Sequence, residues 1–387
     1  MSVSRALWLA LWILPSAAVG QAITKLPMLQ SFHGTELRVQ WESDANPAGS
    51  QNRLEWGAAS PVENLVSAFS TTELAPDRFL HRAVATRLEP QTAYVYRVRS
   101  GSALSPTYSI RTAPLPETPF RMAWIADNQN QLGTPFLSVL TKLAARAPDV
   151  IGHAGDTVQN GDLPAEWQSQ WFDPFAAAPG SLGQRTPVLV ARGNHDGEFP
   201  ESFAYHWLPG NGMWYAETIG RTRLIFLDSN WNVTQQDDFL RAELASAASR
   251  DADFRIVVFH KPPYTNLWDY FGYRGEAWVR DVWTPIFEQG NVDLVVNGHA
   301  HAYERGFLNG IAYTIVGGAG GALDTVPQSP PWAFIQVALS VHHYAIMDVD
   351  GTALHWTVYD LQDHVIDSFE LRSAATGIPV FPTARAR

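Results

Sequence analysis

Polar residues follow five apolar, strand-like runs in this chain of 387 residues, each close after the end of the run. Ligands of open α/β sheets bind beyond the carboxyl ends of the strands, so side chains in these positions can meet at one edge of a sheet. Each motif alone is ordinary turn or cap chemistry, but five of them in this order predict one shared site. The polar residues at these ends include Asp127, Asp156, Asn194, His260, His299 and His301.

The last of the five motifs follows the apolar run 292–296, which is typical of a buried strand. His299 and His301 stand two residues apart, so in extended chain both imidazoles point the same way. Gly298 lets the backbone come close to whatever the two rings hold. This stretch is therefore a candidate metal-binding loop.

The region from 116 to 375 alternates strand-like runs with helical stretches, which predicts an α/β or α+β domain built in layers. We expect helices over 134–147 and 235–248. The expected strands are 121–125, 150–154, 187–191, 223–227, 255–259, 292–296, 311–316, 344–349 and 354–359.

Residues 21–115 have a different pattern and predict an all-β domain. Apolar and polar residues alternate with period two in 37–41 and 93–98, which indicates strands. The run from Leu88 to Tyr94 resembles the tyrosine corner of fibronectin type III sandwiches, which implies that the Tyr94 hydroxyl holds the turn before its strand.

The two ends of the chain carry further signals. Residues 1–20 predict a secretory signal peptide, with Arg5 before an apolar core and small residues at the cleavage site. Residues 376–387 predict a polar tail. We therefore expect a secreted or periplasmic protein that has no contact with a membrane once the signal is cleaved.

The net charge and the lack of cysteine narrow the classes of function. The net charge of -11 argues against binding to a nucleic acid duplex, and it would repel an anionic substrate unless bound cations reverse the sign locally. With no cysteine, the chain has neither disulfides nor thiolate ligands. Any metal must be held by oxygen and nitrogen atoms.

The six residues at the strand ends suit two divalent or trivalent metal ions such as Fe, Zn or Mn. Two ions roughly 3.5–4 Å apart, bridged by a carboxylate, can clamp an in-line displacement at phosphorus and turn a bound water into a hydroxide nucleophile. His195 is the candidate proton donor to the leaving oxygen, and Asp196 is the residue that we expect to orient it.

The order of these motifs resembles that of the calcineurin-like metallophosphoesterases, and the run 298–305 is similar to that of purple acid phosphatases. The resemblance implies an α+β fold with four layers, in which two packed sheets are flanked by helices, preceded by a fibronectin III-like sandwich. It also implies a first metal site of Asp127 and His301, and a second of Asn194, His260 and His299. Asp156 would bridge the two sites, and His195 would contact the substrate or leaving group.

Two positions depart from that family. Purple acid phosphatases carry a tyrosine ligand three residues after the bridging Asp, where this chain has Gln159. Other metallophosphoesterases have a histidine two residues after the first Asp, where this chain has Gln129. The first metal site therefore needs a further ligand, which a glutamine oxygen or a water can supply. Without the tyrosinate we expect no purple charge-transfer colour.

These observations support one main hypothesis and two alternatives. The main hypothesis is a phosphomonoesterase of the acid phosphatase kind that acts on a small phosphate ester. A phosphodiesterase on the same scaffold is the first alternative. The second is a non-catalytic exported metal-binding protein, a reading that the departures at Gln129 and Gln159 leave open.

Overall fold

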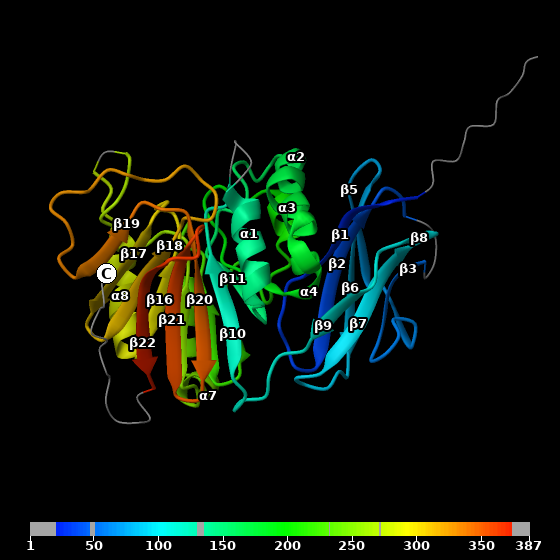
Figure 1. Cartoon of the computed structure of the whole chain (residues 1–387), viewed down its shortest axis with the longest axis horizontal. Coiled ribbons are helices and arrows are strands. Elements are labelled where there is room, and N and C mark those ends of the chain that lie inside the picture. The colour runs from blue at the N-terminus through cyan, green and yellow to red at the C-terminus, as the bar shows by residue number, and fades with distance from the viewer. Residues whose placement is uncertain (1–20, 47–50, 130–134, 232, 271, 374–387) are drawn as a thin grey trace, which may run out of the picture.

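The computed structural model describes residues 21–46, 51–129, 135–231, 233–270 and 272–373 (Figure 1). The predicted signal peptide and the predicted tail 376–387 lie outside the described residues. The described part contains four β-sheets, two from the N-terminal third of the chain and two from the rest.

The N-terminal pair of sheets packs face to face around a core that includes Trp41, Leu54 and Tyr96. The Tyr94 hydroxyl accepts a hydrogen bond from the backbone N–H of Glu89 (2.9 Å), which is the contact predicted for the tyrosine corner. The first sheet has the order β1 (Ile23–Leu29), β2 (Glu36–Ser43), β6 (Arg78–Thr86), β5 (Ser70–Ala75). The second has the order β4 (Asn64–Ser67), β3 (Asn52–Gly57), β7 (Ala93–Ser100), β8 (Ala103–Leu104), with β9 (Tyr108–Arg111) also on β7.

The third sheet has six strands and carries the first three predicted site motifs. Strands β10, β11 and β12 run parallel, so their carboxyl ends lie at the same edge. The order is β12 (Val188–Val190), β11 (Val150–His153), β10 (Phe120–Ile125), β20 (His343–Asp350), β21 (Ala353–Asp360), β22 (Val365–Arg372).

The fourth sheet has seven strands and carries the last two motifs. Strands β14, β15, β16 and β18 run parallel to one another. The order is β13 (Tyr215–Ile219), β14 (Thr222–Phe226), β15 (Phe254–Val258), β16 (Leu294–Asn297), β18 (Ile311–Val316), β17 (Tyr303–Leu308), β19 (Ile335–Leu339). Each of the predicted strands from 121 onward overlaps a strand of these two sheets.

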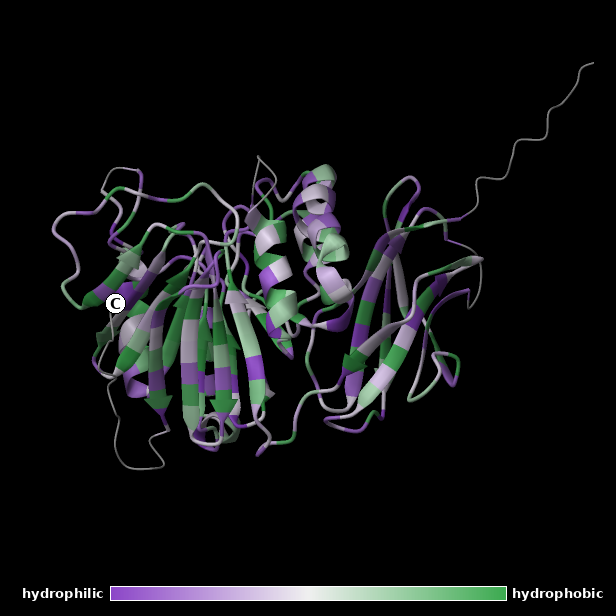
Figure 2. Cartoon of the chain, viewed as in Figure 1, coloured by the Kyte–Doolittle hydropathy of each residue, from purple (hydrophilic) through white to green (hydrophobic). Residues whose placement is uncertain are grey.

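The side chains of β15 alternate between two cores, which shows how the layers are stacked. Ile256 and Val258 belong to the core shared with the six-stranded sheet, whereas Val257 packs with Trp283 and Phe287 of helix α8. Because both faces of such a strand are covered, the parallel strands are mostly apolar, as the largely green central strands in Figure 2 show. The result is the predicted α+β fold of four layers.

Helices cover the outer faces of both C-terminal sheets. Figure 1 shows α1 and α3 between the six-stranded sheet and the N-terminal sheets. The expected helix 235–248 is interrupted, because the Ser246 hydroxyl accepts from the Ser249 N–H (3.1 Å) and starts a new helix. The helices are α1 (Pro135–Arg146), α2 (Pro164–Glu166), a π-helical turn (Trp167–Phe172), α3 (Asp173–Ala177), a 3-10 turn (Pro179–Ser181), α4 (Leu182–Arg185), α5 (Pro200–Tyr205), α6 (Thr234–Leu244), α7 (Ala247–Arg250) and α8 (Ala277–Gln289).

Buried polar contacts join the N-terminal sheets to the helical layer. The side-chain amides of Gln30 and Gln40 both donate to the Tyr205 carbonyl oxygen (2.6 Å each). The Tyr205 hydroxyl donates to Glu42 (2.6 Å). Within the described residues, no helix is long and apolar enough to cross a bilayer.

Candidate metal centre

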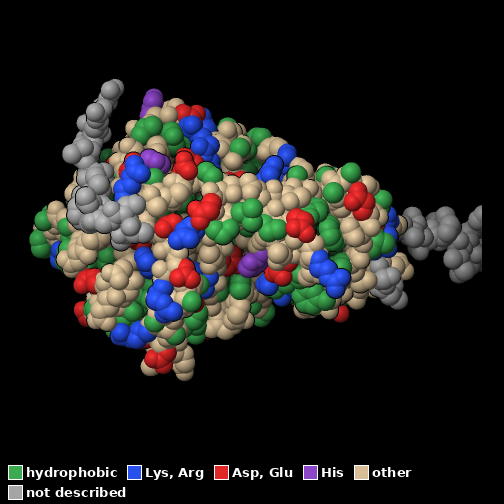
Figure 3. Space-filling view, turned by 90° about the horizontal axis from the view of Figure 1, so that it is seen from below, with side chains coloured by type: hydrophobic (Ala, Val, Ile, Leu, Met, Phe, Trp, Pro, Cys, Tyr) green, Lys and Arg blue, Asp and Glu red, His purple; other side chains and the backbone are tan. Residues whose placement is uncertain are grey.

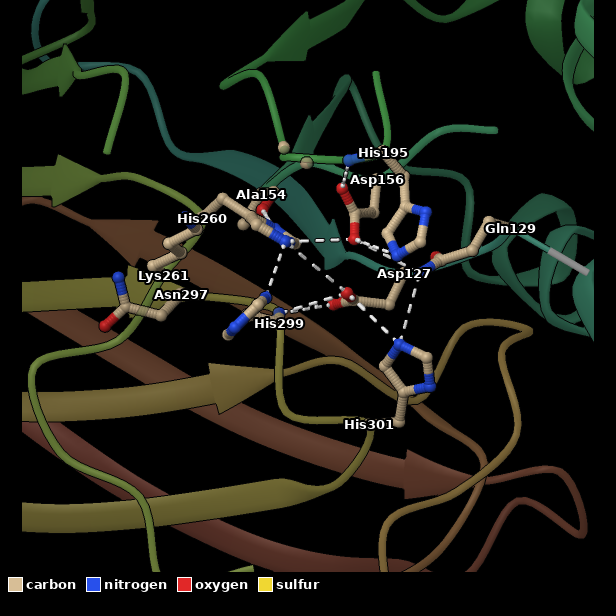
Figure 4. Close-up of polar contacts among 12 residues, drawn as sticks. Asp127, Gln129, Ala154, Asp156, His195, His260, Lys261, Asn297, His299 and His301 are labelled. Atoms are coloured by element: carbon tan, nitrogen blue, oxygen red, sulfur yellow. Dashed lines mark hydrogen bonds and ion pairs between the residues drawn. The ribbon is translucent and has the colours of Figure 1, made fainter. Parts of the chain in front are cut away.

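The strand-end motifs meet at one edge of the two packed C-terminal sheets (Figure 4). Asp127 and Asp156 follow β10 and β11 of the six-stranded sheet, while His260 and His299 follow β15 and β16 of the other sheet. The two sheets therefore each contribute one side of the site, and both carboxylates are buried.

Three of the predicted ligands form a compact group around the Asp156 carboxylate. His260 Nε2 lies 3.0 Å from Asp156 Oδ2, and His299 Nδ1 lies 3.2 Å from the same His260 nitrogen. The potential ligand atoms of Asp156, His260 and His299 all lie within 4.8 Å of one another. His260 Nδ1 donates to the Ala154 carbonyl oxygen (2.9 Å), so Nε2 is the nitrogen that faces the carboxylate and would bind a metal after losing its proton.

Asp127 and His301 form the adjoining half of the site. His301 Nε2 lies 3.5 Å from Asp127 Oδ1, and His301 Nδ1 donates to the Ala322 carbonyl oxygen (2.6 Å). The backbone N–H of His299 donates to the Asp127 carboxylate (2.9 Å), so the second carboxylate is anchored by the histidine loop. In both halves a backbone carbonyl thus selects the histidine tautomer.

The backbone at these positions is held in an unusual conformation. Asp127, Asp156 and His299 have φ of 59°, 58° and 73°, in the left-handed region that costs non-glycine residues free energy. Close packing adds a second constraint, because a Cβ on Gly193 would lie 2.1 Å from Asp156 Oδ1. A Cβ on Gly298 would likewise lie 2.5 Å from Asp127 Oδ2. The glycines in these motifs therefore make room for the carboxylates.

Asn194, the remaining predicted ligand, is exposed, in contrast to the five side chains above. His195 is half-buried beside it, and its Nε2 points toward Asp156 Oδ2 at 4.0 Å (Figure 4). The His195 backbone N–H donates to Asp156 Oδ1 (2.8 Å). The chain after β12 thus ties His195 to the predicted bridging carboxylate.

The structure gives Asp196 other partners than the His195 ring. Its buried carboxylate accepts the backbone N–H groups of Asp156 (3.1 Å), Thr157 (2.9 Å) and Gly193 (2.7 Å). The His195 ring instead contacts Gln159, whose carbonyl oxygen accepts from Nδ1 (2.8 Å). Asp196 therefore holds the loops together, and the orienting role that we expected of it belongs to Gln159.

The two carboxylates and the histidines change one another's pKa values. Burial lowers the pKa of His260, but Asp156 and Asp127 outweigh it and raise the pKa to about 9. For His301, the Asp127 carboxylate likewise overcomes burial and raises the pKa to about 9. The pKa of His299 lies well below its ordinary value because of burial and the neighbouring His260. The site therefore has a negative potential that attracts cations.

The donor set fits a pair of metal ions. Metal bonds of about 2.0–2.2 Å from imidazole nitrogen and carboxylate oxygen place neighbouring ligand atoms roughly 3 Å apart, as observed between His260 and Asp156. Gln129 Oε1 is buried beside these ligands without a hydrogen-bond partner among the described residues. Asp127, Asp156, His260, His299 and His301 are thus the residues that would hold the metals.

A cleft of about 710 Å³ opens over the site. It contains Trp268, whose ring stacks on His299 with centroids 4.8 Å apart, and Asp324, which accepts the His301 backbone N–H (2.8 Å). His342 also lines the cleft. The lining residues are Gln129, Pro135, Asp156, Gln159, His195, Trp268, Asp269, Tyr270, His299, His301, Gly320, Gly321, Ala322, Asp324 and His342.

Sequence reasoning missed Trp268 and Asp324 as parts of the site because neither stands directly after a predicted strand. Two signals in the sequence could have found them: the loop after His260 is rich in aromatic residues, and the glycine run 317–321 lies shortly before Asp324. On the face shown in Figure 3, basic and acidic side chains are intermixed, so the described residues of that face form no broad basic surface.

Two family models match the chain. The model of the calcineurin-like phosphoesterases matches residues 120–303, and the model of the purple acid phosphatase N-terminal domain matches residues 28–112. Purple acid phosphatase 5 of Arabidopsis thaliana is 26% identical over 314 residues, which cover 79% of this chain and 76% of that protein.

Other relatives are less fully covered. An uncharacterized protein of Mycobacterium tuberculosis is 25% identical over 317 residues, and the match spans 70% of this chain but 59% of that protein. Probable inactive purple acid phosphatase 27 of Arabidopsis thaliana is 24% identical, with 78% of this chain and 61% of that protein covered.

Solved structures share the fold. The purple acid phosphatase from yellow lupin seeds superimposes with a TM-score of 0.77 at 20% identity, over 89% of this chain and 74% of the lupin chain. PhoD superimposes with a TM-score of 0.64 at 13% identity, over 92% of each chain.

Proposed function

Since this chain belongs to the calcineurin-like phosphoesterases and carries an N-terminal domain of the purple acid phosphatase type, we propose that it hydrolyses phosphate monoesters at a centre of two metal ions. The observation that supports this proposal most is the convergence of Asp127 and Asp156 with three histidines from the facing sheet. The bound metals would supply the positive charge and the activated water for attack at phosphorus.

Each residue has a distinct task in the proposed reaction. Asp156, which lies between His260 and the Gln129 amide, would contribute to both metal sites. Asp127 and His301 would serve the first site, and His260 and His299 would serve the second. Asn194, which is exposed, would join the second site through its side-chain oxygen.

His195 would protonate the leaving oxygen as the phosphorus–oxygen bond breaks. In its cationic form the ring carries a hydrogen on both nitrogens, and Nδ1–H is engaged by the Gln159 carbonyl oxygen. Nε2–H is then free on the side that faces Asp156, where the ester would lie. Alcohol and phosphate are the products, and water restores the proton.

A phosphodiesterase is the second candidate, and the charge of the cleft favours it. None of the described residues that line the cleft is lysine or arginine, whereas Asp269 and Asp324 are both present. A monoester dianion would find no lysine or arginine there for its second charge, while a diester carries only one.

Metal analysis followed by assays on matched mono- and diesters in the same preparation tests the proposal. Asp156→Ala and His260→Ala should abolish phosphate release and lower the bound metal. Unchanged turnover in both variants would falsify the dinuclear assignment. Metal binding without turnover of any ester would instead support a binding protein.

The location of the protein is part of the same proposal. The pattern of residues 1–20 indicates export, so we propose a secreted or periplasmic enzyme. The mass of the purified natural protein measures this directly, because cleavage after about residue 20 would remove the predicted signal.

A further inference from the structure

Gln129 lies between two predicted ligands of the first metal site, four residues after the end of β10. Its Nε2 is 3.1 Å from Asp156 Oδ2 and 3.2 Å from His301 Nε2 (Figure 4). The residue is 2% exposed, so its amide has no alternative partner in solvent. Its backbone N–H donates to the Asp156 carbonyl oxygen (3.4 Å), which holds the residue beside the site.

The polar atoms nearest the Gln129 amide nitrogen are metal-binding atoms, an Asp156 carboxylate oxygen and His301 Nε2. Because His301 Nδ1–H is donated to the Ala322 carbonyl oxygen, Nε2 is the ring nitrogen whose lone pair becomes available to a cation when that nitrogen loses its proton. The NH₂ group of Gln129 thus occupies a place where lone pairs converge, which is the place of a cation. Meanwhile Gln129 Oε1 is buried with no partner among the described residues.

A half-turn of the amide group exchanges its oxygen and nitrogen at nearly the same positions. After such a turn, Oε1 would face the position between Asp156 and His301, and the unpartnered oxygen would have a cation to bind. A buried carbonyl oxygen without a partner is unfavourable, and metal binding to Oε1 would provide one.

We propose that Gln129 Oε1 is a ligand of the first metal ion, together with Asp127, Asp156 and His301. This inference rests on the proposed function, because it presumes a metal at that place. A neutral oxygen donor adds no negative charge, so the site should prefer a divalent ion such as Mn²⁺ over a trivalent one.

Gln159 is the second glutamine that stands where the related families have a metal ligand, and its contacts differ from those of Gln129. Its side-chain Nε2 lies 3.0 Å from His195 Nδ1, and its backbone carbonyl oxygen accepts a hydrogen bond from the same nitrogen. Its side chain is thus engaged with the predicted proton donor, which makes Gln159→Ala the matched control.

Titration of metal-free protein with Mn²⁺ tests the inference, with unbound Mn²⁺ measured by electron paramagnetic resonance. We expect the wild type to bind two equivalents. Gln129→Ala should weaken one of the two sites by about 10–100-fold and leave the other unchanged. Gln159→Ala should bind both equivalents with the wild-type affinity.

Gln129→Glu keeps the size of the side chain and should tighten the same site, so it tests the inference even where the alanine variant does not fold. Wild-type affinity at both sites in Gln129→Ala and Gln129→Glu overturns the inference and leaves the proposed function standing. Equal weakening in Gln159→Ala also overturns it. A wild-type protein that binds no Mn²⁺ contradicts the dinuclear centre itself.

Discussion

Two buried carboxylates in this molecule have the same exposure and opposite surroundings. Glu42, where the N-terminal sheets meet the helical layer, and Asp156, at the metal centre, are each 1% exposed. Glu42 lies 2.7 Å from Lys25 Nζ and 3.6 Å from Arg78, which are a lysine and an arginine rather than histidines. Asp156 has His260 at 3.0 Å and His195 at 4.0 Å, whose charge depends on protonation.

The difference between these counterions separates a structural charge from a functional one. Burial raises the pKa of both carboxyls, but Lys25 outweighs it at Glu42 and His260 outweighs it at Asp156, so both are held below their ordinary values. Lys25 cannot leave Glu42 without exposing a buried charge. The histidines around Asp156 can give up protons and offer the same nitrogens to a metal.

Removal of Asp156 should have the largest effect. Asp156→Ala takes away the carboxylate that we propose is shared by the two metal sites, so we expect phosphate release to fall by at least about 10³-fold, with loss of bound metal. Glu42→Gln, the matched change at the other carboxylate, should keep both. If Asp156→Ala retains its bound metal and its steady-state rate of phosphate release, the functional difference between Asp156 and Glu42 is contradicted.

His195→Ala sharpens the comparison within the metal centre. The variant keeps Asp127, Asp156 and the three metal-binding histidines, so its metal content should match the wild type. The rate of ester hydrolysis should fall by about 10²–10⁴-fold because the leaving oxygen loses its proton donor. A substrate with a very acidic leaving alcohol should show a much smaller loss, and an equal loss on both substrates would contradict the role of His195.

Glu42→Ala tests the structural side of the comparison. Lys25 would be left buried without its carboxylate, and breaking such a pair typically costs about 3–5 kcal/mol in the free energy of unfolding. Urea unfolding measures this loss. Metal stoichiometry and turnover of the folded variant should remain those of the wild type, and a loss of metal would show that the two regions are coupled.

Glu217 is a third kind of buried carboxyl and should show the smallest effect. The half-exposed His33 ring lies 3.6 Å from its carboxyl group, and burial raises the pKa of Glu217 from 4.5 to about 7. Between these values the folded state keeps a proton that the unfolded state releases, so stability falls as pH rises from about 4.5 to 7.

Glu217→Gln should remove this loss of stability at rising pH, because the glutamine side chain does not titrate. Relative to the wild type, the variant should gain up to about 3 kcal/mol in the free energy of unfolding between pH 5 and pH 8. Unfolding curves at the two pH values measure the gain. An equal difference between variant and wild type at both pH values would mean that Glu217 is ionised in the folded protein.

The strand ends were predictable because their chemistry is local. An apolar run followed by Asp127 or Asp156 already places a carboxylate at a sheet edge, and one sheet edge is where parallel strands bring such groups together. The break between α6 and α7 was not predictable in the same way, since the apolar pattern continues through Ala245 and only the cap formed by Ser246 ends the first helix.

The hydrogen-bond partners of individual side chains could not be predicted from the sequence. The acidic neighbour of His195 suggested that Asp196 orients the ring, but folding turns that carboxylate toward the backbone of Asp156 and Thr157. In a loop of consecutive turns, two adjacent residues can point their side chains in different directions, so adjacency in the sequence does not show that they are in contact. The ring is oriented by Gln159, 36 residues away along the chain.

The sequence by itself determined which chemistry is available to this protein: oxygen and nitrogen ligands, no thiolate, and polar groups at the ends of apolar strands. Only the tertiary structure decided which of these atoms face one another. It brought Gln129 between Asp156 and His301, and left Asn194 exposed. The physical reason is that strand periodicity is a local property of the chain, whereas the approach of two sheets is set by packing across the whole core.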